Sequence, residues 1–424
     1  MFGWEFPPHI SGGLGTASYG LTKGMSKIPG MKIKFIVPKA YGDEDQSRMR
    51  IVGANDIVLS KKLVDYESFL REIEYIEINS RIVPYTDPEE YYKAILDAEV
   101  EGRSFIFTNF SGKLTFSGKY GENLFQEIAN YAVVASVLAE EKDFDVIHAH
   151  DWLTFPAGIA AKKVSGKPLV IHVHATDFDR SGGSANPAVF DIEMKGMRIA
   201  DKIIAVSNLT RNTIIEKYGI DPEKVVTVHN AVEPLQDAEI HMLKRNINDK
   251  IVTFLGRVTL QKGPEYFIEA AYKVLQKMDN VRFVMAGSGE LLNRMIMRAA
   301  SLRIADKFHF TGFLKGDDVN RMFSISDVYV MPSVSEPFGI SPLEAMQSSV
   351  PVIISHQSGV SEVLQYAMKV DFWDIDAMAD AIYGILNYSA LSDMFKTYGK
   401  EEVENLKWEN SALKVNEVYQ SIVK

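Results

Sequence analysis

The sequence contains no cysteine, which excludes disulfide bonds, thiolate chemistry and cysteine-ligated metal sites. It has no apolar run approaching the length of a membrane span, and its N-terminus does not resemble a signal peptide. The formal net charge of −10 disfavours a surface for nucleic acid or for an anionic membrane. We therefore expect a soluble, cytoplasmic protein whose partners are neither nucleic acids nor membranes.

Several nucleotide-binding and hydrolase motifs are also missing. The glycine-rich stretch near residue 13 does not match Gly-x-Gly-x-x-Gly, the fingerprint of dinucleotide-binding folds, and there is no Walker phosphate loop. Neither a Gly-x-Ser-x-Gly elbow nor a Ser-His-Asp signature appears. These absences argue against a nicotinamide-dependent enzyme, a P-loop nucleotidase and a serine hydrolase.

The sequence does contain two regions in which short apolar runs alternate with amphipathic stretches. Such alternation is typical of a parallel sheet with helices on both faces. It runs from residue 145 to residue 228 and starts again at residue 251, after a polar stretch, 231–249, that indicates a linker. The predicted strands are 145–149, 168–173, 202–206, 224–228, 251–255, 281–286, 307–310, 327–331 and 351–354.

This rhythm predicts an α/β protein with two doubly wound, Rossmann-like domains that face a cleft. Residues 1–232 form the first domain and residues 233–409 the second. The last helix, about 411–422, carries apolar residues on overlapping turns, so we expect it to cross back to the first domain. Residues 410–424 are therefore assigned to the first domain.

The segment 39–125 is more polar and less regular than the rest of the chain. We interpret it as an insertion with its own strands, at 74–78 and 104–109, and as a possible acceptor-side surface. A long helix is predicted directly after it, at 124–140, from apolar residues at helical spacing.

The most informative stretch is 335–345, which follows the predicted strand 327–331. Ser341, Pro342 and Glu344 have the spacing of a helix start with a Ser-x-x-Glu capping box. A strand, a turn and a helix start in this order place free backbone N–H groups at the positive end of a helix dipole. Such a group of amides suits an anion, and phosphate best of all.

Two carboxylates, Glu336 and Glu344, flank these amides, and Gly339 between them permits a tight turn with positive φ. Taken singly, Glu344 is explained as a capping residue and Glu336 as a solvated loop acid. The pair lies at the carboxyl end of a buried strand, where open α/β sheets bind ligands. Together they therefore indicate a ligand site.

Two cations, Arg257 and Lys262, follow the predicted strand 251–255 at the same sheet edge as Glu336. Arginine can clamp a phosphate through two hydrogen bonds, and lysine adds a point charge. The pair is either two solvated loop charges or a clamp for a diphosphate. Two helix-start anion sites favour the clamp, one at Gly12–Gly15 and one at Gly339–Ser341. A further glycine turn, Gly287-Ser288-Gly289-Glu290, ends the neighbouring strand and widens the same cleft.

Four histidines end two neighbouring strands of the first domain. His148 and His150 are two residues apart, and their side chains are expected to point to opposite faces or edges of the sheet. His172 and His174 repeat the pattern, and Asp177, Asp179 and Arg180 follow them. His150 lies nearer the carboxyl end of its strand and thus nearer the predicted cleft. No acid stands at helical metal spacing from these histidines, so no metal site is predicted.

With these residues in view, the chain resembles retaining glycosyltransferases of family 4 with the GT-B fold, and within them the glycogen and starch synthase-like members. The resemblance covers nearly the whole chain. It is strongest in 335–345, where seven residues separate Glu336 from Glu344. The stretches 12–15, 256–263 and 148–152 fit the same family.

The resemblance implies roles for these residues. Arg257 and Lys262 would hold the donor diphosphate, Glu344 its ribose and Glu336 the hydroxyls of the transferred sugar. His150 would touch that sugar near its 6-hydroxyl. The expected residues are Glu336, His150, Arg257 and Lys262 for catalysis, Gly13, Gly256, Gly287, Phe338, Gly339, Ile340 and Glu344 for the donor, and His174, Asp177 and Arg180 for the acceptor. Because the two cations neutralise the leaving diphosphate, the family needs no metal, and no cofactor is expected.

The function that the resemblance implies is transfer of glucose from UDP-glucose or ADP-glucose to the end of an α-1,4-glucan, with retention of the α configuration. Ile10 stands where bacterial ADP-glucose enzymes have lysine, which leaves UDP-glucose at least as probable a donor as ADP-glucose. The alternatives are a family 4 transferase acting on a lipid-linked or cell-surface saccharide, a phosphorylase-like enzyme, and a non-catalytic nucleotide-sugar-binding protein. The sequence does not predict the oligomeric state.

Overall fold

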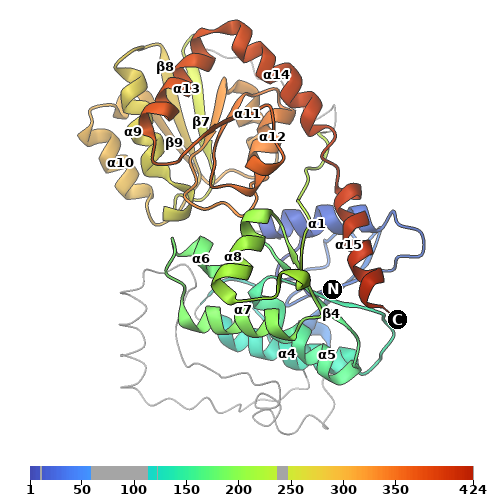
Figure 1. Ribbon diagram of the computed structural model, residues 1–424. Coiled ribbons are helices and arrows are strands. Elements are labelled where there is room, and N and C mark those ends of the chain that lie inside the picture. Colours follow the sequence, from blue (N-terminus) through green and yellow to red (C-terminus); the bar gives the residue numbers. More distant parts are fainter. Residues whose placement is uncertain (10–11, 59–112, 122, 236–246, 424) are drawn as a thin grey trace, which may run out of the picture. The chain divides into compact units, whose positions relative to one another are not determined.

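The computed structural model describes all residues except 10–11, 59–112, 122, 236–246 and 424 (Figure 1). The chain divides into two compact units, each with its own buried apolar core. Unit 1 consists of Met1–Val206, Thr210–Val228 and Trp408–Lys424, and unit 2 of Ser207–Leu209 and His229–Lys407. The strands predicted at 74–78 and 104–109 lie outside the described residues.

The sheet of unit 1 is parallel. Strands β3, β4, β5 and β6 pair in chain order, and β1 pairs with β2. Phe2 joins the two groups through parallel bridges to Ile36 of β1 and Ala149 of β3, so the N-terminal segment is the central strand. The strands are β1 (Lys34–Val37), β2 (Arg50–Gly53), β3 (Ile147–His150), β4 (Leu169–Val173), β5 (Lys202–Ala205) and β6 (Val225–Thr227).

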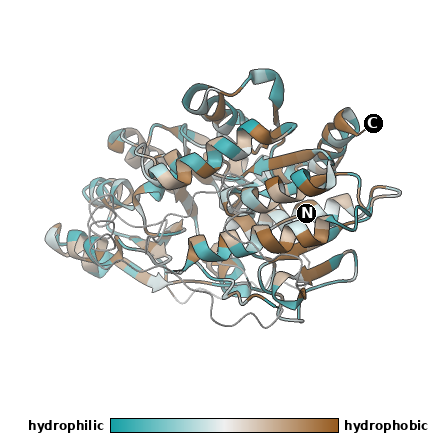
Figure 2. Cartoon of the chain, turned by 90° about the horizontal axis from the view of Figure 1, so that it is seen from below, coloured by the Kyte–Doolittle hydropathy of each residue, from teal (hydrophilic) through white to brown (hydrophobic). Residues whose placement is uncertain are grey.

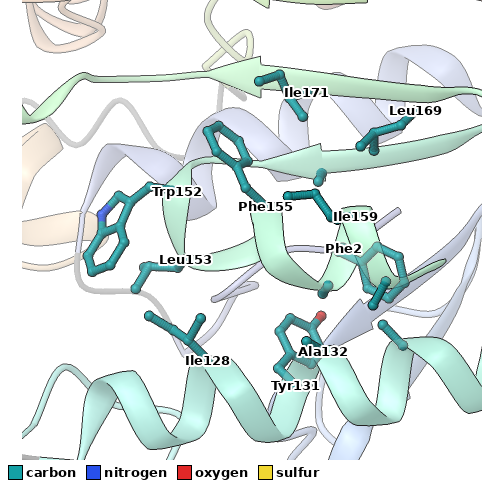
Figure 3. Close-up of a cluster of buried hydrophobic side chains, with 14 of the residues drawn as sticks. Phe2, Ile128, Tyr131, Ala132, Trp152, Leu153, Phe155, Ile159, Leu169 and Ile171 are labelled. Carbon is teal, nitrogen blue, oxygen red and sulfur yellow. The ribbon is translucent and has the colours of Figure 1, made fainter. Parts of the chain in front are cut away.

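Helices cover this sheet, and Figure 2 shows apolar and polar residues alternating along the helical ribbons. The helices are α1 (Gly13–Met25), α4 (Leu124–Ala139), α5 (Phe155–Ser165), α6 (Asp177–Arg180), α7 (Pro187–Ile199), α8 (Asn208–Tyr218) and α15 (Trp408–Ile422). In the core, Tyr131 of α4 packs edge-on against Phe2, and Phe155 of α5 is almost wholly buried near Ile171 of β4 (Figure 3). Burying one such side chain contributes about 1.5–3 kcal/mol.

The C-terminal helix α15 packs against α1 within unit 1 (Figure 1). Its first residue, Trp408, is buried against the α1 glycine Gly20, and Glu409 pairs with Lys27. Further along α15, the hydroxyl of Tyr419 hydrogen bonds the ring of His148 on β3. The predicted return of the last helix to the first half of the chain is therefore confirmed.

Unit 2 is a six-stranded parallel sheet in the order β12-β11-β10-β7-β8-β9. This is the Rossmann order, in which the chain starts in the middle of the sheet and changes direction between β7 and β10. The strands are β7 (Lys250–Leu255), β8 (Val281–Ala286), β9 (Phe308–Gly312), β10 (Val328–Met331), β11 (Val352–Ser355) and β12 (Met368–Val370). The helices are α9 (Pro264–Leu275), α10 (Leu292–Ser301), α11 (Asp317–Ile325), α12 (Ser341–Gln347), α13 (Ile375–Asn387) and α14 (Ser389–Val403).

The predicted α/β class and the parallel, doubly wound sheets are confirmed, and the predicted strands agree with the observed ones to within one to three residues. One interpretation needs correction: β2 lies in the segment taken as an insertion, yet it is an ordinary strand of the unit 1 sheet, paired along its length with β1. In the described part of the chain, no helix is both long and apolar enough to cross a membrane.

Candidate active site

The first part of the candidate site lies at the turning point of the unit 2 sheet, where β7 and β10 are paired neighbours. Arg257 and Lys262 follow β7, and Glu336 follows β10. The ammonium group of Lys262 donates a hydrogen bond to the carboxylate of Glu336, whose side chain is only 8% exposed. The structure thus joins two predicted residues that are 74 positions apart. This edge is where open α/β sheets bind ligands.

The loop after β7 holds both cations in place. A short 3₁₀ turn, Leu260–Lys262, ends at Gly263, and the carbonyl of Gln261 accepts from the backbone N–H of Val334 in the loop after β10. The side-chain oxygen of Gln261 accepts from the guanidinium of Arg257 at 3.0 Å. Gln261 therefore ties the two loops together and orients Arg257, a role that the sequence analysis missed.

Glu336 is held by backbone pairing with the chain after β11. Its N–H donates to the carbonyl of Gln357 and its carbonyl accepts from the N–H of Gly359, so that Glu336 forms an isolated parallel bridge to Ser358. The hydroxyl of Ser333 also donates to the carboxylate, at 3.3 Å. Because both its backbone and its side chain have partners, the carboxylate of Glu336 has a defined position.

The helix after Glu336 begins differently from the prediction. Ser341 is the first residue of α12 and not its N-cap, and its hydroxyl shares a 2.8 Å hydrogen bond with Tyr329. The predicted Ser-x-x-Glu capping box is therefore wrong, because the nearby phenol of Tyr329 engages the serine. Glu344 points into a buried environment instead, and burial raises the pKa of its carboxyl to about 7.

The turn before α12 has the geometry expected of it. Gly339 has φ of 99°, a value that favours glycine, and Phe338 is buried below it. In the described part of the chain, the N–H groups of Gly339 and Ile340 have no acceptor. They are therefore available to an anion at the start of the helix.

The turn at Gly287, which follows β8, lies very close to the turn at Gly256, which follows β7. A Cβ atom at Gly287 would lie 1.8 Å from the carbonyl oxygen of Gly256, so only glycine allows the two turns to touch. The N–H of Gly287 donates to the carbonyl of Gly312 at the end of β9. The predicted donor residues of unit 2 therefore share one sheet edge.

In unit 1, the glycine turn starts α1 at Gly13, and the space beside Gly12 and Gly13 is open. One of the amides expected to bind phosphate is already engaged. The N–H of Gly15 donates to the carboxylate of Glu5, which is 6% exposed, at 3.2 Å. Glu5 was not predicted, although it directly follows the central strand, where a buried acid is uncommon.

The four histidines form a stack of rings on one face of the unit 1 sheet. The ring centroids of His148 and His150 are 4.4 Å apart, as are those of His172 and His174. The expectation that the paired side chains point to opposite faces was wrong, because residues i and i+2 of a strand share a face. His150 is fully buried, and a 3.0 Å hydrogen bond joins it to the half-buried His174.

Burial and the neighbouring imidazoles lower the pKa of His148, His150 and His172 well below the usual value, so these rings are neutral. The pKa of His174 is lowered as well, mainly by burial. A histidine stack of this kind is therefore neutral and almost closed to water.

The predicted acceptor residues Asp177 and Arg180 lie in α6, inside a buried network of charges. The guanidinium of Arg180 pairs with Asp151 at 3.0 Å and with Glu193 at 3.1 Å. The second oxygen of Asp151 accepts from the backbone N–H of His174. Burial raises the pKa of Glu193 to about 8. The network fixes the backbone that carries His174, and sequence analysis missed Asp151 and Glu193 as members.

A family model described as Glycosyltransferase Family 4 matches residues 107–235, and one described as Glycosyl transferases group 1 matches residues 236–402. An uncharacterised glycosyltransferase of Methanocaldococcus jannaschii is 30% identical over 294 residues, which cover 65% of this chain and 75% of that protein. The chain belongs to the family 4 glycosyltransferases. Transfer of a sugar is therefore the activity expected of the enzyme.

Two further comparisons concern a relative in sequence and a relative in structure. A glycogen synthase of Mycobacterium tuberculosis is 24% identical over 283 residues, 65% of this chain and 68% of that protein. The solved structure of a sucrose-phosphate synthase from Thermosynechococcus elongatus superposes with a TM-score of 0.69 at 17% identity, covering 97% of this chain and 94% of that one. The structural likeness shows the GT-B fold. Because these relatives are named for different products, the family alone does not fix the acceptor.

Proposed function

We propose that this glycosyltransferase moves glucose from UDP-glucose or ADP-glucose to the end of an α-1,4-glucan, with retention of the α configuration. The observation that carries the proposal is the pairing of Lys262 with Glu336 at the turning point of the unit 2 sheet. In this proposal the pair supplies a cation for a diphosphate directly beside a carboxylate for sugar hydroxyls.

In this proposal the donor separates the pair. The diphosphate takes the ammonium of Lys262 and the guanidinium of Arg257, and the N–H groups near Gly339 contact it as well. The carboxylate of Glu336, released from Lys262, accepts from hydroxyls of the glucose. Glu344 accepts from the ribose, in keeping with its position one helical turn inside α12.

The proposed transfer step develops negative charge on the departing phosphate. The bond between C1 of glucose and the β-phosphate oxygen breaks while the acceptor hydroxyl oxygen forms a bond to C1 from the same face. The acceptor proton passes to the departing phosphate, which leaves as nucleoside diphosphate. Negative charge grows on that phosphate, so cations fixed beside it stabilise the transition state more than the ground state. We expect this step to need no metal and no cofactor.

The acceptor assignment rests on the 148–152 run and on the likeness to glucan synthases. Of the residues predicted for the acceptor, His174 is half-buried, Asp177 is buried, and the side chain of Arg180 is only 6% exposed. Arg180 also donates to the carbonyl of Ala175 at 2.8 Å, next to His174. We therefore propose that His174 contacts the acceptor and that Arg180 positions the backbone that carries it.

A screen of nucleotide sugars tests the function. The purified protein is incubated with UDP-glucose, ADP-glucose and other nucleotide sugars, each with and without maltooligosaccharides, and nucleoside diphosphate release is measured. We expect release from a glucose donor to increase with maltooligosaccharide, and the lengthened product to carry a new α linkage by NMR. Stimulation by a lipid-linked or small saccharide alone would refute the glucan assignment. Donor binding without turnover would indicate a binding protein.

Two variants that lower turnover but differ in their effect on nucleoside diphosphate binding test the pairing of Lys262 with Glu336. Lys262→Ala should lower turnover roughly a hundredfold, about 3 kcal/mol of barrier, and weaken nucleoside diphosphate binding. Glu336→Gln should also lower turnover, yet bind nucleoside diphosphate at least as tightly, because Lys262 loses its competing partner. Lys277→Ala, at an exposed position of unit 2, is the control and should match the wild type. Weaker diphosphate binding by Glu336→Gln would contradict the exchange of partners.

A further inference from the structure

Three histidines of unit 1 bring nitrogen atoms together in the buried layer on one face of the sheet. His148 and His150 are two positions apart on β3, and His172 is the register partner of His150 on β4. Their exposed fractions are 1%, 0% and 2%. One ring nitrogen from each lies within 4.8 Å of those of the other two. Two ligands from one strand and one from its neighbour can approach a single ion from one side.

Among the residues that the structure describes, several of these nitrogens have no hydrogen-bond partner. They are Nε2 of His148, Nε2 of His150 and both ring nitrogens of His172. Buried side-chain polar atoms almost always have a partner, because leaving one without any costs the free energy of its lost hydration. Several such atoms on three neighbouring buried rings indicate a ligand that accepts nitrogen lone pairs.

The remaining nitrogens are bonded in the way that metal-binding histidines require. Nδ1 of His148 hydrogen bonds the hydroxyl of Tyr419 from α15, and Nδ1 of His150 bonds Nε2 of His174 at 3.0 Å. A hydrogen bond at one ring nitrogen orients the ring and selects the tautomer whose other nitrogen is free to ligate. In both residues the bonded atom is Nδ1 and the atom without a partner is Nε2.

We propose that His148, His150 and His172 bind one late transition-metal dication, with Zn²⁺ the best match. Imidazole nitrogen suits zinc, nickel and copper, whereas magnesium and calcium prefer oxygen ligands. With Zn–N bonds of about 2.0–2.1 Å, tetrahedral ligands lie roughly 3.4 Å apart. Because the rings are stacked and their nitrogens lie within 4.8 Å of one another, the rings must turn out of the stack and move closer to bind the ion. The ion would join β3 to β4 and, through Tyr419, to α15.

This site is separate from the proposed donor site, although two of its ligands belong to the 148–152 run and His150 hydrogen bonds His174. The charge of the leaving diphosphate is neutralised by Arg257 and Lys262 in unit 2, and no step of sugar transfer passes through the ion. The assignment does give His150 the role of a ligand in place of the predicted contact with the sugar. Its test therefore measures metal content and stability, which a failure of the transferase proposal would not change.

The experiment uses the full chain without a histidine tag. The protein is equilibrated with Zn²⁺, freed of excess, and its metal content is measured by mass spectrometry, with Co²⁺ as a visible-absorbing substitute. We expect about one ion per chain and a thermal unfolding temperature that rises with Zn²⁺. His172→Asn should lose the ion, and Tyr419→Phe should bind it roughly tenfold more weakly. His309→Asn, at an exposed position of unit 2, should behave as the wild type.

Circular dichroism of each variant shows whether it has folded. If His172→Asn does not fold, the titration of the wild type decides by itself. Failure of the untagged wild type to retain Zn²⁺, Ni²⁺, Co²⁺ or Cu²⁺ would overturn the proposal and assign the histidine nitrogens to buried water. Equal metal retention by His172→Asn and His309→Asn would overturn it as well.

Discussion

Glu344 is half-buried, and the partial loss of water around its carboxyl makes the nucleotide-free protein sensitive to pH. Burial raises its pKa from 4.5 to about 7. The folded protein therefore keeps a proton on Glu344 between these values, whereas the unfolded chain releases it. Stability from this group is fully present below pH 4.5 and is lost as pH rises through about 7. A ribose hydroxyl that donates to the carboxylate would offset part of this cost.

Replacing Glu344 with Gln should remove this dependence. The free energy of unfolding of Glu344→Gln should match the wild type near pH 5 and exceed it at pH 8, by up to roughly 3 kcal/mol. Urea unfolding of the nucleotide-free protein at both pH values measures the difference. Glu290→Gln, at an exposed acid of the same unit, should change neither value. A wild-type advantage at pH 8 would contradict the raised pKa of Glu344, because the ionised carboxylate would then stabilise the folded state.

Residue types were easier to predict than contacts between residues. Glu336 and Lys262 were both singled out from their local sequence, but their hydrogen bond depends on β7 and β10 being neighbours, which no local pattern encodes. For the same reason Glu5, whose carboxylate binds the amide of Gly15, gave no signal beyond an acid next to an apolar run. The face shared by His148 and His150 did follow from strand geometry and was misjudged.

At the scale of elements, apolar periodicity predicted the central strands and the helices that cover them. It gave no prediction for β12, α13, α14 and α6. The strand β12 has only three residues at the sheet edge and α6 only four, so neither displays a period. Only three of the fifteen residues of α14 are buried, which leaves a weak apolar stripe. Periodicity is informative only where an element buries a face.

Two glycines of α1 explain how α15 can pack so closely. A Cβ atom at Gly20 would lie 2.2 Å from the indole of Trp408, and one at Gly24 would lie 2.6 Å from the backbone carbonyl oxygen of Trp408. The two glycines are four residues apart and therefore share one side of the helix. They form the surface against which the start of α15 packs, although alanine would be the better helix former at both positions.

Alanine at Gly24 should therefore destabilise unit 1. The clash is with backbone, which cannot move aside as a side chain can, so we expect a loss of about 1–3 kcal/mol in the free energy of unfolding. The matched control is Gly384→Ala on α13, where a Cβ atom would meet only Leu391 at 3.8 Å. That variant should gain about 0.5–1 kcal/mol. Chemical denaturation of both measures the contrast, and stabilisation by Gly24→Ala would show that α15 does not pack on α1.

For the whole molecule, the repeated strand rhythm predicted two units, but it did not give the order of strands. In unit 1 the first strand lies between β1 and β3, and in unit 2 β7 lies between β10 and β8. Each unit thus starts in the middle of its sheet and builds outward in both directions. This order brings the loops after β7 and β10 together, and so it creates the candidate donor site from two separate motifs.

Two separate cores predict two unfolding transitions, of which only one should respond to nucleotide. Because the proposed diphosphate ligands lie in unit 2, a nucleoside diphosphate at a hundred times its Kd should raise the free energy of unfolding of that unit by about 2.7 kcal/mol. Removing residues 408–424 should lower the transition of unit 1, because Trp408 and Tyr419 no longer cover α1 and His148.

Tryptophan fluorescence distinguishes the two transitions. Trp4, Trp152 and Trp408 are at most 3% exposed in unit 1, whereas Trp373 of unit 2 is 56% exposed, so fluorescence follows the unfolding of unit 1. Calorimetry follows both units. We expect nucleoside diphosphate to shift the calorimetric transition of unit 2, which fluorescence does not report. Deletion of residues 408–424 should shift the transition of unit 1, which both methods report. A single transition that moves equally by both methods would contradict independent units, and a nucleotide shift seen in fluorescence alone would place the diphosphate in unit 1.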